Sequence, residues 1–214
     1  MHNRCWLAVI ICITLASTST IYPLIQVLFS PKDSPTTTLL ELIGNAKKSI
    51  IAAVYMLTDQ KIASALVGAA ERGVTINLVL DRCSTDQYGK ADYLAQSGIT
   101  VAIFKSVKVP KWGFGGLMHN KFAVFDNKKL WTGSFNWTQS ANKMNCENII
   151  ISDDPIVCAV YTAYFQTLAS TNTAPYISRP YKESSVSLTQ QVQALLTSCT
   201  NDEALHEALV ALLT

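Results

Sequence analysis

The chain has 214 residues, of which 49% are hydrophobic and only 15% are charged, and its formal net charge at pH 7 is +2. Average soluble proteins carry about 25% charged residues, so this composition excludes an intrinsically disordered chain. With 9 Gly and 7 Pro the chain is neither collagen-like nor proline-rich. The length predicts one domain with at most a small appendage. The net charge gives little bulk attraction for nucleic acid, so an anionic partner has to be held by a local site.

An apolar leader opens the chain. Residues 6–16 (WLAVIICITLA) follow Arg4 and precede four hydroxyl residues, which is the layout of a secretory signal. The uncharged stretch over residues 6–29 is also long enough to span a bilayer, for which about 20 residues suffice. We therefore predict that residues 1–29 are a cleaved signal peptide or a retained membrane anchor, with a buried helix as the third option. The first two place the protein outside the cytosol (periplasmic or secreted) or on a membrane through residues 6–29.

Beyond a polar linker at residues 30–36, helices and strands alternate. Apolar residues at helical spacing predict helices over residues 37–49, 59–72 and 88–96, and short apolar runs predict strands over 50–56, 75–80 and 100–104. This order predicts an α/β domain with a mixed, largely parallel sheet flanked by helices on both faces. Asp81 and Arg82 end one of these strands, where α/β proteins often place ligand contacts, and we interpret both as structural.

The pattern changes after residue 104. Residues 105–116 (KSVKVPKWGFGG) are predicted to form a loop, followed by strands over 119–125, 130–132 and 148–152 and a helix over 155–168. Residues 37–169 are thus predicted as one α/β domain, and residues 170–214 as a linker and a C-terminal helical extension. Four cysteines (Cys83, Cys146, Cys158 and Cys199) show no zinc-binding spacing. Buried free thiols and a disulfide formed after export both stay open for them.

One segment carries a pattern specific enough to indicate chemistry. Its residues are His119, Lys121, Asp126, Ser134 and Asn136. Alternate strand residues face the same side, so His119 and Lys121 project together, one as nucleophile or base and the other as a cation for phosphate. After a tight turn, the next strand returns Ser134 and Asn136 toward the same place. Such groups around an imidazole are suited to a phosphodiester transition state.

This segment resembles the signature of the phospholipase D superfamily, HxKx₄Dx₆GSxN, of which every position is filled. Downstream, Glu147 with Asn148 resembles the acidic residue of that family, and residues 56–59 with the following helix resemble its first strand–helix–strand unit. The resemblance spans residues 37–169. The chain's size and single motif are similar to those of the small bacterial endonucleases and mitochondrial cardiolipin hydrolases of the superfamily.

The resemblance implies a covalent mechanism. His119 would attack phosphorus and form a phosphohistidine, which splits one difficult displacement into two. Lys121, Ser134 and Asn136 would bind the non-bridging oxygens, and Glu147 would hydrogen-bond to the histidine and fix its tautomer. No clustered carboxylates suggest a divalent metal site, and the family it resembles needs none, so we expect no metal and no cofactor.

Two features leave alternatives open. Asp126 lies beside the turn, where a direct role and a structural salt bridge or turn cap are equally compatible with the sequence. In the loop before His119, Lys108 and Lys111 are candidates for holding phosphates, and Trp112 is a candidate for stacking on bases or entering a lipid interface. An ordinary solvated loop with one buried Trp is the alternative.

The sequence thus predicts a metal-independent phosphodiesterase. Its first candidate substrate is a phospholipid, hydrolysed to phosphatidate and a free head group. The alternative is an endonuclease that cleaves DNA or RNA by the same mechanism, and a second alternative is a non-catalytic phosphate- or membrane-binding module. A second imidazole must protonate the leaving oxygen, because a lysine with a pKa near about 10.4 is a poor acid for it. Since single-motif members of the family pair two chains, we expect a homodimer with a shared active site.

Overall fold

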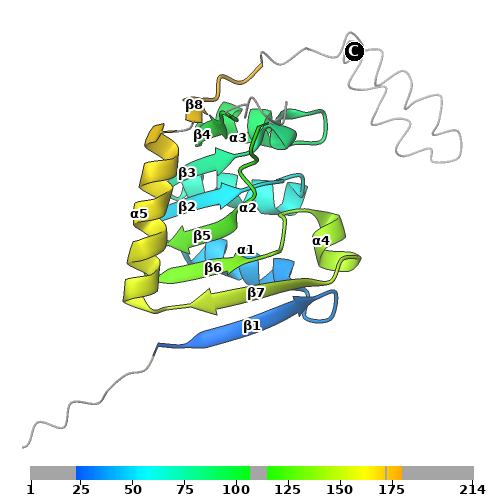
Figure 1. Ribbon diagram of the computed structural model, residues 1–214, viewed down its shortest axis with the longest axis vertical. Helices are drawn as coiled ribbons and strands as arrows, with labels where there is room; N and C mark the ends of the chain where they lie inside the picture. The colour runs from blue at the N-terminus through cyan, green and yellow to red at the C-terminus, as the bar shows by residue number, and fades with distance from the viewer. Residues whose placement is uncertain (1–22, 107–114, 172, 180–214) are drawn as a thin grey trace, which may run out of the picture. The chain divides into compact units, whose positions relative to one another are not determined.

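The computed structural model of the chain describes residues 23–106, 115–171 and 173–179. In chain order its elements are β1 (Ile25–Ser30), α1 (Pro35–Asn45), β2 (Ser49–Val54), α2 (Gln60–Glu71), β3 (Thr75–Leu80), α3 (Ala91–Gln96), β4 (Thr100–Phe104), β5 (Lys121–Phe125), β6 (Lys129–Gly133), α4 (Gln139–Lys143), β7 (Glu147–Ser152), α5 (Pro155–Thr171) and β8 (Thr173–Pro175). The strands form one sheet with α5 across one face and α1 and α2 on the other (Figure 1).

The predicted α/β class is confirmed, but the prediction of a largely parallel sheet is wrong. The strand order is β1-β7-β6-β5-β2-β3-β4-β8, and only the β2–β3 and β3–β4 pairs are parallel, whereas the other five pairs are antiparallel. The two parallel pairs are those joined by helical crossovers through α2 and α3. The central antiparallel strand β5 is buried on both faces, so it has the same continuous apolar run as a parallel strand. All five residues of β5 are buried.

The sheet separates two hydrophobic cores. Ala52 and Val54 of β2 face the core that includes α1 and α2, whereas Ala53 between them faces the core under α5. The strand β5 alternates in the same way, with Phe122 and Val124 on the α5 side. Helices on both faces are therefore confirmed, and burial on both faces holds the central strands rigidly in place.

All of the strand β1 except its last residue lies inside the range that we predicted as the leader. It pairs with β7 at one edge of the sheet, and Leu28 and Ser30 are buried while Ile25, Val27 and Phe29 are exposed. A half-buried edge strand and the end of an apolar leader produce the same sequence pattern, which is why the predicted boundary at residue 29 falls within a strand. Residues 1–22 of the predicted leader lie outside the described residues.

Within the described ranges, no helix combines the length and the apolar character needed to cross a membrane. The predicted C-terminal helices lie outside those ranges. The range 170–214, predicted as a linker and a helical extension, contains the short strand β8, which pairs with β4 at the other edge of the sheet.

Candidate active site

The motif residues come together where the ends of four neighbouring strands lie side by side, at the edge of the sheet that the strand ends form. Strands β5 and β7 run antiparallel to their neighbours β2 and β6. The ends of β2 and β6 therefore lie beside the starts of β5 and β7. His119 and Lys121 stand at the start of β5, Ser134 follows β6, and Glu147 begins β7. Residues separated by up to 28 positions in the sequence thus share one site.

Tyr55, the residue that follows β2, contacts both His119 and Lys121. Its ring centroid lies 4.6 Å from that of the exposed imidazole of His119, with the ring planes tilted by 58°. The Lys121 Nζ lies 5.0 Å from the Tyr55 ring centroid. The Tyr55 backbone N–H donates to the Asn120 carbonyl at 2.8 Å. The aromatic ring is therefore a wall against which the two predicted catalytic side chains are aligned, and sequence analysis missed it because the motif does not include it.

Lys121 is a buried cation, with only 6% of its surface exposed. Its Nζ donates to the carbonyl of His119 at 2.7 Å, which orients the ammonium toward the same edge as the imidazole. Burial lowers the pKa of Lys121 below its ordinary value, and the negative charge of Glu147 acts in the opposite direction. The one hydrogen bond given for this ammonium is to a neutral carbonyl, so its charge is available to an incoming anion.

Glu147 is held by Ser134 rather than by His119. The Ser134 hydroxyl donates to one carboxylate oxygen of Glu147, and the Asn145 side-chain amide donates to the other at 3.1 Å. Among the described residues, no hydrogen bond joins Glu147 to the His119 imidazole. The structure therefore gives the carboxylate a different partner from the one that the resemblance implied, and its negative charge acts on Lys121 instead.

The loop after β6 places Asn136 at the site. Trp137 is fully buried, its backbone N–H donates to the Met56 carbonyl at 2.9 Å, and its backbone carbonyl accepts from the backbone N–H groups of Thr58 and Asp59. The side-chain oxygen of Asn136 is buried without a hydrogen-bond partner. Buried polar groups in native proteins are nearly always paired, so this oxygen would be satisfied by a ligand that brings an N–H or O–H donor.

Gly133 allows β6 and β7 to approach closely where the loop begins. A Cβ on this residue would collide with the backbone carbonyl of Asn148. The N–H of Ser134 donates to that same carbonyl at 3.0 Å, and the Asn148 N–H donates to the Ser134 hydroxyl at 3.1 Å. The motif therefore requires glycine at this position for a structural reason, because any larger residue would prevent Ser134 from reaching β7.

Asp126 is at the other end of β5 and does not join the site. It lies five positions after Lys121, or about 17 Å along the strand. Its carboxylate accepts hydrogen bonds from the backbone N–H groups of Lys47, Lys48 and Ser49. Burial alone would raise the pKa of Asp126, but these hydrogen bonds outweigh it and leave the pKa below its ordinary value. The structural role is therefore the one that the geometry supports.

Asp81 anchors the segment that leads into the site. Its carboxylate accepts from the N–H of Met118 at 3.0 Å and from the N–H of Cys83 at 3.3 Å. The Cys83 thiol in turn donates to the Tyr55 carbonyl at 2.9 Å. Burial and the charge of Asp81 raise the pKa of Cys83 to about 11, so the thiol stays protonated at neutral pH. The end of β3 thus supports both Tyr55 and the start of β5.

Some sequence-based predictions cannot be placed. The candidate contact residues Lys108, Lys111 and Trp112 lie outside the described residues. Of the cysteines that the structure describes, Cys83, Cys146 and Cys158 have free thiols, and only Cys158 is buried.

Comparison with known proteins adds three findings. The model of the family described as "cardiolipin synthase, PLD-like domain" matches residues 39–169. A phospholipase D of Rickettsia bellii is 38% identical over 127 residues, which are 59% of this chain and 59% of the relative. A mitochondrial cardiolipin hydrolase of Xenopus tropicalis is 34% identical over 138 residues, which are 64% of this chain and 61% of the relative. The chain thus matches about three fifths of the length of these curated relatives.

A solved structure shows the same fold. Nuc from Salmonella typhimurium, a phospholipase D family member, aligns with a TM-score of 0.63 and 32% sequence identity. The alignment covers 73% of this chain and 100% of that chain. The fold is therefore shared with a solved structure along that structure's whole length.

Proposed function

This chain belongs to the phospholipase D-like family, and from that membership we propose that it is a phosphodiesterase that works through a phosphohistidine on His119. The observation that carries the proposal is the meeting of His119, Lys121 and the Ser134–Glu147 pair at one edge of the sheet. These groups come from three places in the chain, the start of β5, the end of β6 and the start of β7, and a merely structural motif has no need to gather them. Metal independence is part of the proposal.

The proposed reaction has two displacements. An imidazole nitrogen of His119 attacks phosphorus, forming an N–P bond as the P–O bond to the leaving alcohol breaks, and a second imidazole gives the leaving oxygen its proton. That second imidazole then takes a proton from water, whose oxygen attacks phosphorus and releases His119. The ammonium of Lys121 and the side-chain NH₂ group of Asn136 would donate to the non-bridging oxygens, where charge develops in the transition state.

We propose a phospholipid as the substrate, hydrolysed to phosphatidate and a free head group. Relatives that bear the names phospholipase D and mitochondrial cardiolipin hydrolase support this choice, as does the apolar composition of the chain. The alternative substrate is DNA or RNA, because the groups at the site bind a phosphodiester whatever its substituents. The lysine-rich loop at residues 105–116 favours that alternative.

Turnover in excess EDTA separates these options. The full chain is incubated with phospholipid vesicles and, in parallel, with single-stranded and double-stranded DNA. Release of the lipid head group without DNA cleavage supports the proposal, whereas cleavage of DNA alone makes the protein a nuclease. Loss of all activity with EDTA contradicts the metal-free mechanism. Inactivity on every substrate, with and without EDTA, leaves a phosphate- or membrane-binding module.

We also propose that two chains share one active site. His119 is the one histidine among the described residues, so the second imidazole has to come from elsewhere, and a two-fold partner supplies the same residue from the other side. Helix α5 provides a surface for this contact, because its 17 residues include no charged side chain. Ile156, Val160 and Tyr164 form an exposed apolar stripe along it, and the Tyr164 hydroxyl accepts a hydrogen bond from the Asn120 side chain at 3.2 Å.

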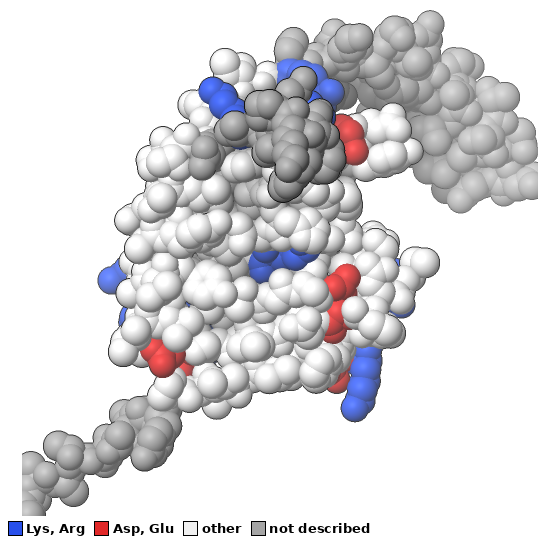
Figure 2. All heavy atoms as spheres, viewed as in Figure 1, with Lys and Arg blue, Asp and Glu red and all other residues white. Residues whose placement is uncertain are grey.

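The face of the molecule that carries α5 has few charges. In Figure 2, basic atoms near the centre of this face have acidic atoms beside them, and uncharged residues surround both. Exposed apolar side chains that gather in one place mark interaction sites, and the stripe of Ile156, Val160 and Tyr164 on α5 is such a group. Mixing inactive His119→Ala chains with wild-type chains tests the proposal. If both imidazoles are needed, activity falls with the square of the wild-type fraction, and a linear fall contradicts the shared site.

For localisation we propose export or membrane attachment through the leader. Because β1 begins at Ile25 and pairs with β7, a cleavage that keeps the fold has to lie before it. The hydroxyl residues at 17–20 fit that requirement. N-terminal sequencing of the protein recovered from cell fractions tests this. A mature chain that begins after residue 30 would contradict the arrangement, since it would lack β1.

A further inference from the structure

A buried hydroxyl at the end of the edge strand β1 holds the start of β7. It belongs to Ser30, of which only 5% is exposed, and Ser30 pairs with Glu147 at the end of the β1–β7 ladder. The hydroxyl donates to the backbone carbonyl of Asn145 at 2.9 Å and accepts from the backbone N–H of Glu147 at 3.2 Å. It therefore fixes both ends of the short segment, residues 145–147, that leads from α4 into β7.

The same segment holds the carboxylate of Glu147. One carboxylate oxygen accepts from the Ser134 hydroxyl, and the other accepts from the Asn145 side-chain amide at 3.1 Å. Two backbone hydrogen bonds hold Asn145 in turn: its N–H donates to the Ser140 carbonyl of α4, and its carbonyl accepts from Ser30. The second of these ties Asn145 to the sheet, so the Ser30 hydroxyl determines where the amide that binds the carboxylate stands.

The position of this carboxylate matters for the ammonium of Lys121. Burial lowers the pKa of Lys121, and the negative charge of Glu147 opposes that effect. The attraction between two charges falls as the distance between them grows. A carboxylate that is free to move away from Lys121 therefore stabilises the charged form of the lysine less than one that is held in place.

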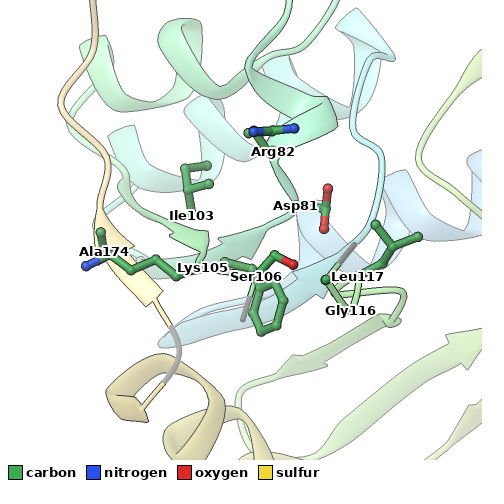
Figure 3. A pocket seen from close by; sticks show the side chains of 10 residues that line it. Asp81, Arg82, Ile103, Lys105, Ser106, Gly116, Leu117 and Ala174 are labelled. Carbon is green, nitrogen blue, oxygen red and sulfur yellow. The ribbon is translucent and has the colours of Figure 1, made fainter. Parts of the chain in front are cut away.

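The other titratable groups near Lys121 do not replace this charge at neutral pH. Burial and the charge of Asp81 raise the pKa of Cys83 to about 11, and the charge of Cys83 and burial raise the pKa of Tyr55 above its ordinary value. The imidazole of His119 is neutral or positive. Asp81 lines a cavity of ≈ 810 Å³ at the ends of β3 and β4 (Figure 3), where two backbone N–H groups hold its carboxylate. The carboxylate that acts on Lys121 is thus the one that the Ser30 hydroxyl helps to place.

We propose that Ser30 is a positioning residue of the active site, which holds the carboxylate of Glu147 in place beside Lys121 through the segment of residues 145–147. It contacts neither the substrate nor the reacting atoms. The proposal rests on the phosphodiesterase function proposed above, in which Lys121 binds the phosphate. It gives β1 a part in the active site, although the sequence pattern placed Ser30 in a linker.

The pKa of Lys121 reports the position of the carboxylate without any turnover. It is measured on the full chain by NMR titration of ¹³C-labelled lysine, with the Lys121 signal assigned from its loss in Lys121→Gln. In Ser30→Ala this pKa should fall, because the charge of Glu147 is no longer held beside the ammonium. The control Ser152→Ala removes a serine that is equally buried, at 6% exposed, from the other end of β7. It should leave the pKa of Lys121 unchanged.

Three further variants separate a positioning role from a loss of packing. In a Glu147→Gln chain, Ser30→Ala should cause no additional fall in the pKa of Lys121, because Ser30 acts only through that carboxylate. Ser30→Thr keeps a hydroxyl and should keep the wild-type pKa. Asn145→Ala changes an exposed residue, so the fold is not at risk, and it should lower the pKa as Ser30→Ala does. An additional fall in the double variant, a threonine variant that titrates like the alanine variant, or an unchanged pKa in Asn145→Ala overturns the proposal.

Turnover of a chromogenic phosphodiester, bis(p-nitrophenyl) phosphate, separates this proposal from the function on which it rests. In Ser30→Ala, KM should begin to rise at lower pH than in the wild-type chain, and at about pH 9 it should be about threefold higher. If the wild-type chain hydrolyses neither this ester nor phospholipid nor DNA, while the pKa of Lys121 still depends on Ser30, the phosphodiesterase function fails and the positioning role stands. If turnover is normal while the pKa of Lys121 is the same in every Ser30 variant, the positioning role fails and the function stands.

Discussion

The two ends of strand β5 carry residues of one sequence motif but are built in opposite ways. At the start of the strand, His119 is exposed, Lys121 is a buried cation, and nearby Asn136 has an unpaired side-chain oxygen. At the other end, the Asp126 carboxylate is saturated by three backbone N–H groups. The start of the strand thus carries groups that are open to a ligand. At the other end, the hydrogen bonds of Asp126 join the turn after β5 to the chain before β2.

This contrast shows that a motif can combine chemistry and architecture. Asp126 holds the β5–β6 turn in register, and that register determines where Ser134 returns to the site. A residue can therefore be required at a fixed spacing because it sets the geometry and without any contact with the substrate. The two ends should respond differently to substitution, one in turnover and the other in stability.

Replacement of His119 by alanine is expected to have the largest effect on turnover. The imidazole is the nucleophile of the proposed mechanism, so kcat should fall by at least about a thousandfold, or about 4 kcal/mol. The free energy of unfolding should barely change, because the side chain is exposed. Steady-state kinetics and thermal melts measure both. A variant that retained more than about a tenth of the wild-type kcat would remove His119 from its assigned role.

Replacement of Asp126 by alanine should show the reverse pattern. Three backbone N–H groups lose their acceptor, as at a lost helix cap, which costs about 1–2 kcal/mol of the free energy of unfolding. The kcat of the folded fraction should stay close to that of the wild-type chain. Since the folded pKa of Asp126 lies below its ordinary value, its contribution is present at neutral pH and is lost as the pH falls below about 4. Urea unfolding at several pH values checks this. If the difference in the free energy of unfolding between variant and wild type became larger in acid, the prediction would be contradicted.

The aromatic wall of the site gives a smaller effect. Tyr55→Leu removes a cation–π contact with Lys121 and a ring contact with His119, so kcat should fall about tenfold, which corresponds to about 1.4 kcal/mol. Tyr55→Phe keeps the ring and should retain wild-type kcat within about a factor of two. Kinetics of the two variants in parallel distinguish the ring from its hydroxyl. If the phenylalanine variant were as slow as the leucine variant, the hydroxyl would be the functional group instead.

Most of the fold and the core of the site could be predicted from the sequence because their signals are local. The predicted strand over residues 75–80 has the bounds of β3, and the spacing of His119 and Lys121 placed both at one strand end. Strand direction could not be predicted, since burial on both faces removes the alternation that marks antiparallel strands.

The missing parts of the site depend on contacts between distant segments. Tyr55 lies 64 residues before His119 and belongs to no local pattern, so only the pairing of β2 with β5 brings the two together. The partner of Glu147 is set in the same way, by Gly133 and the approach of β6 to β7. The one signal that could have indicated Tyr55 is its position directly after a buried strand, where α/β folds gather functional groups.

The smallest expected effect is a shift in pH dependence at the active end of β5. Lys121 has to carry its charge to bind a phosphate, so KM should rise as the pH increases through its pKa. Glu147 raises that pKa against the effect of burial, so Glu147→Gln should lower it and move the rise in KM to lower pH, by up to about one unit. The glutamine oxygen can still accept from Ser134. KM measured from about pH 6 to about pH 10 shows the shift, with Glu71→Gln on the exposed end of α2 as the matched control. An unchanged profile, or a shift to higher pH, would mean that the charge of Glu147 does not act on Lys121.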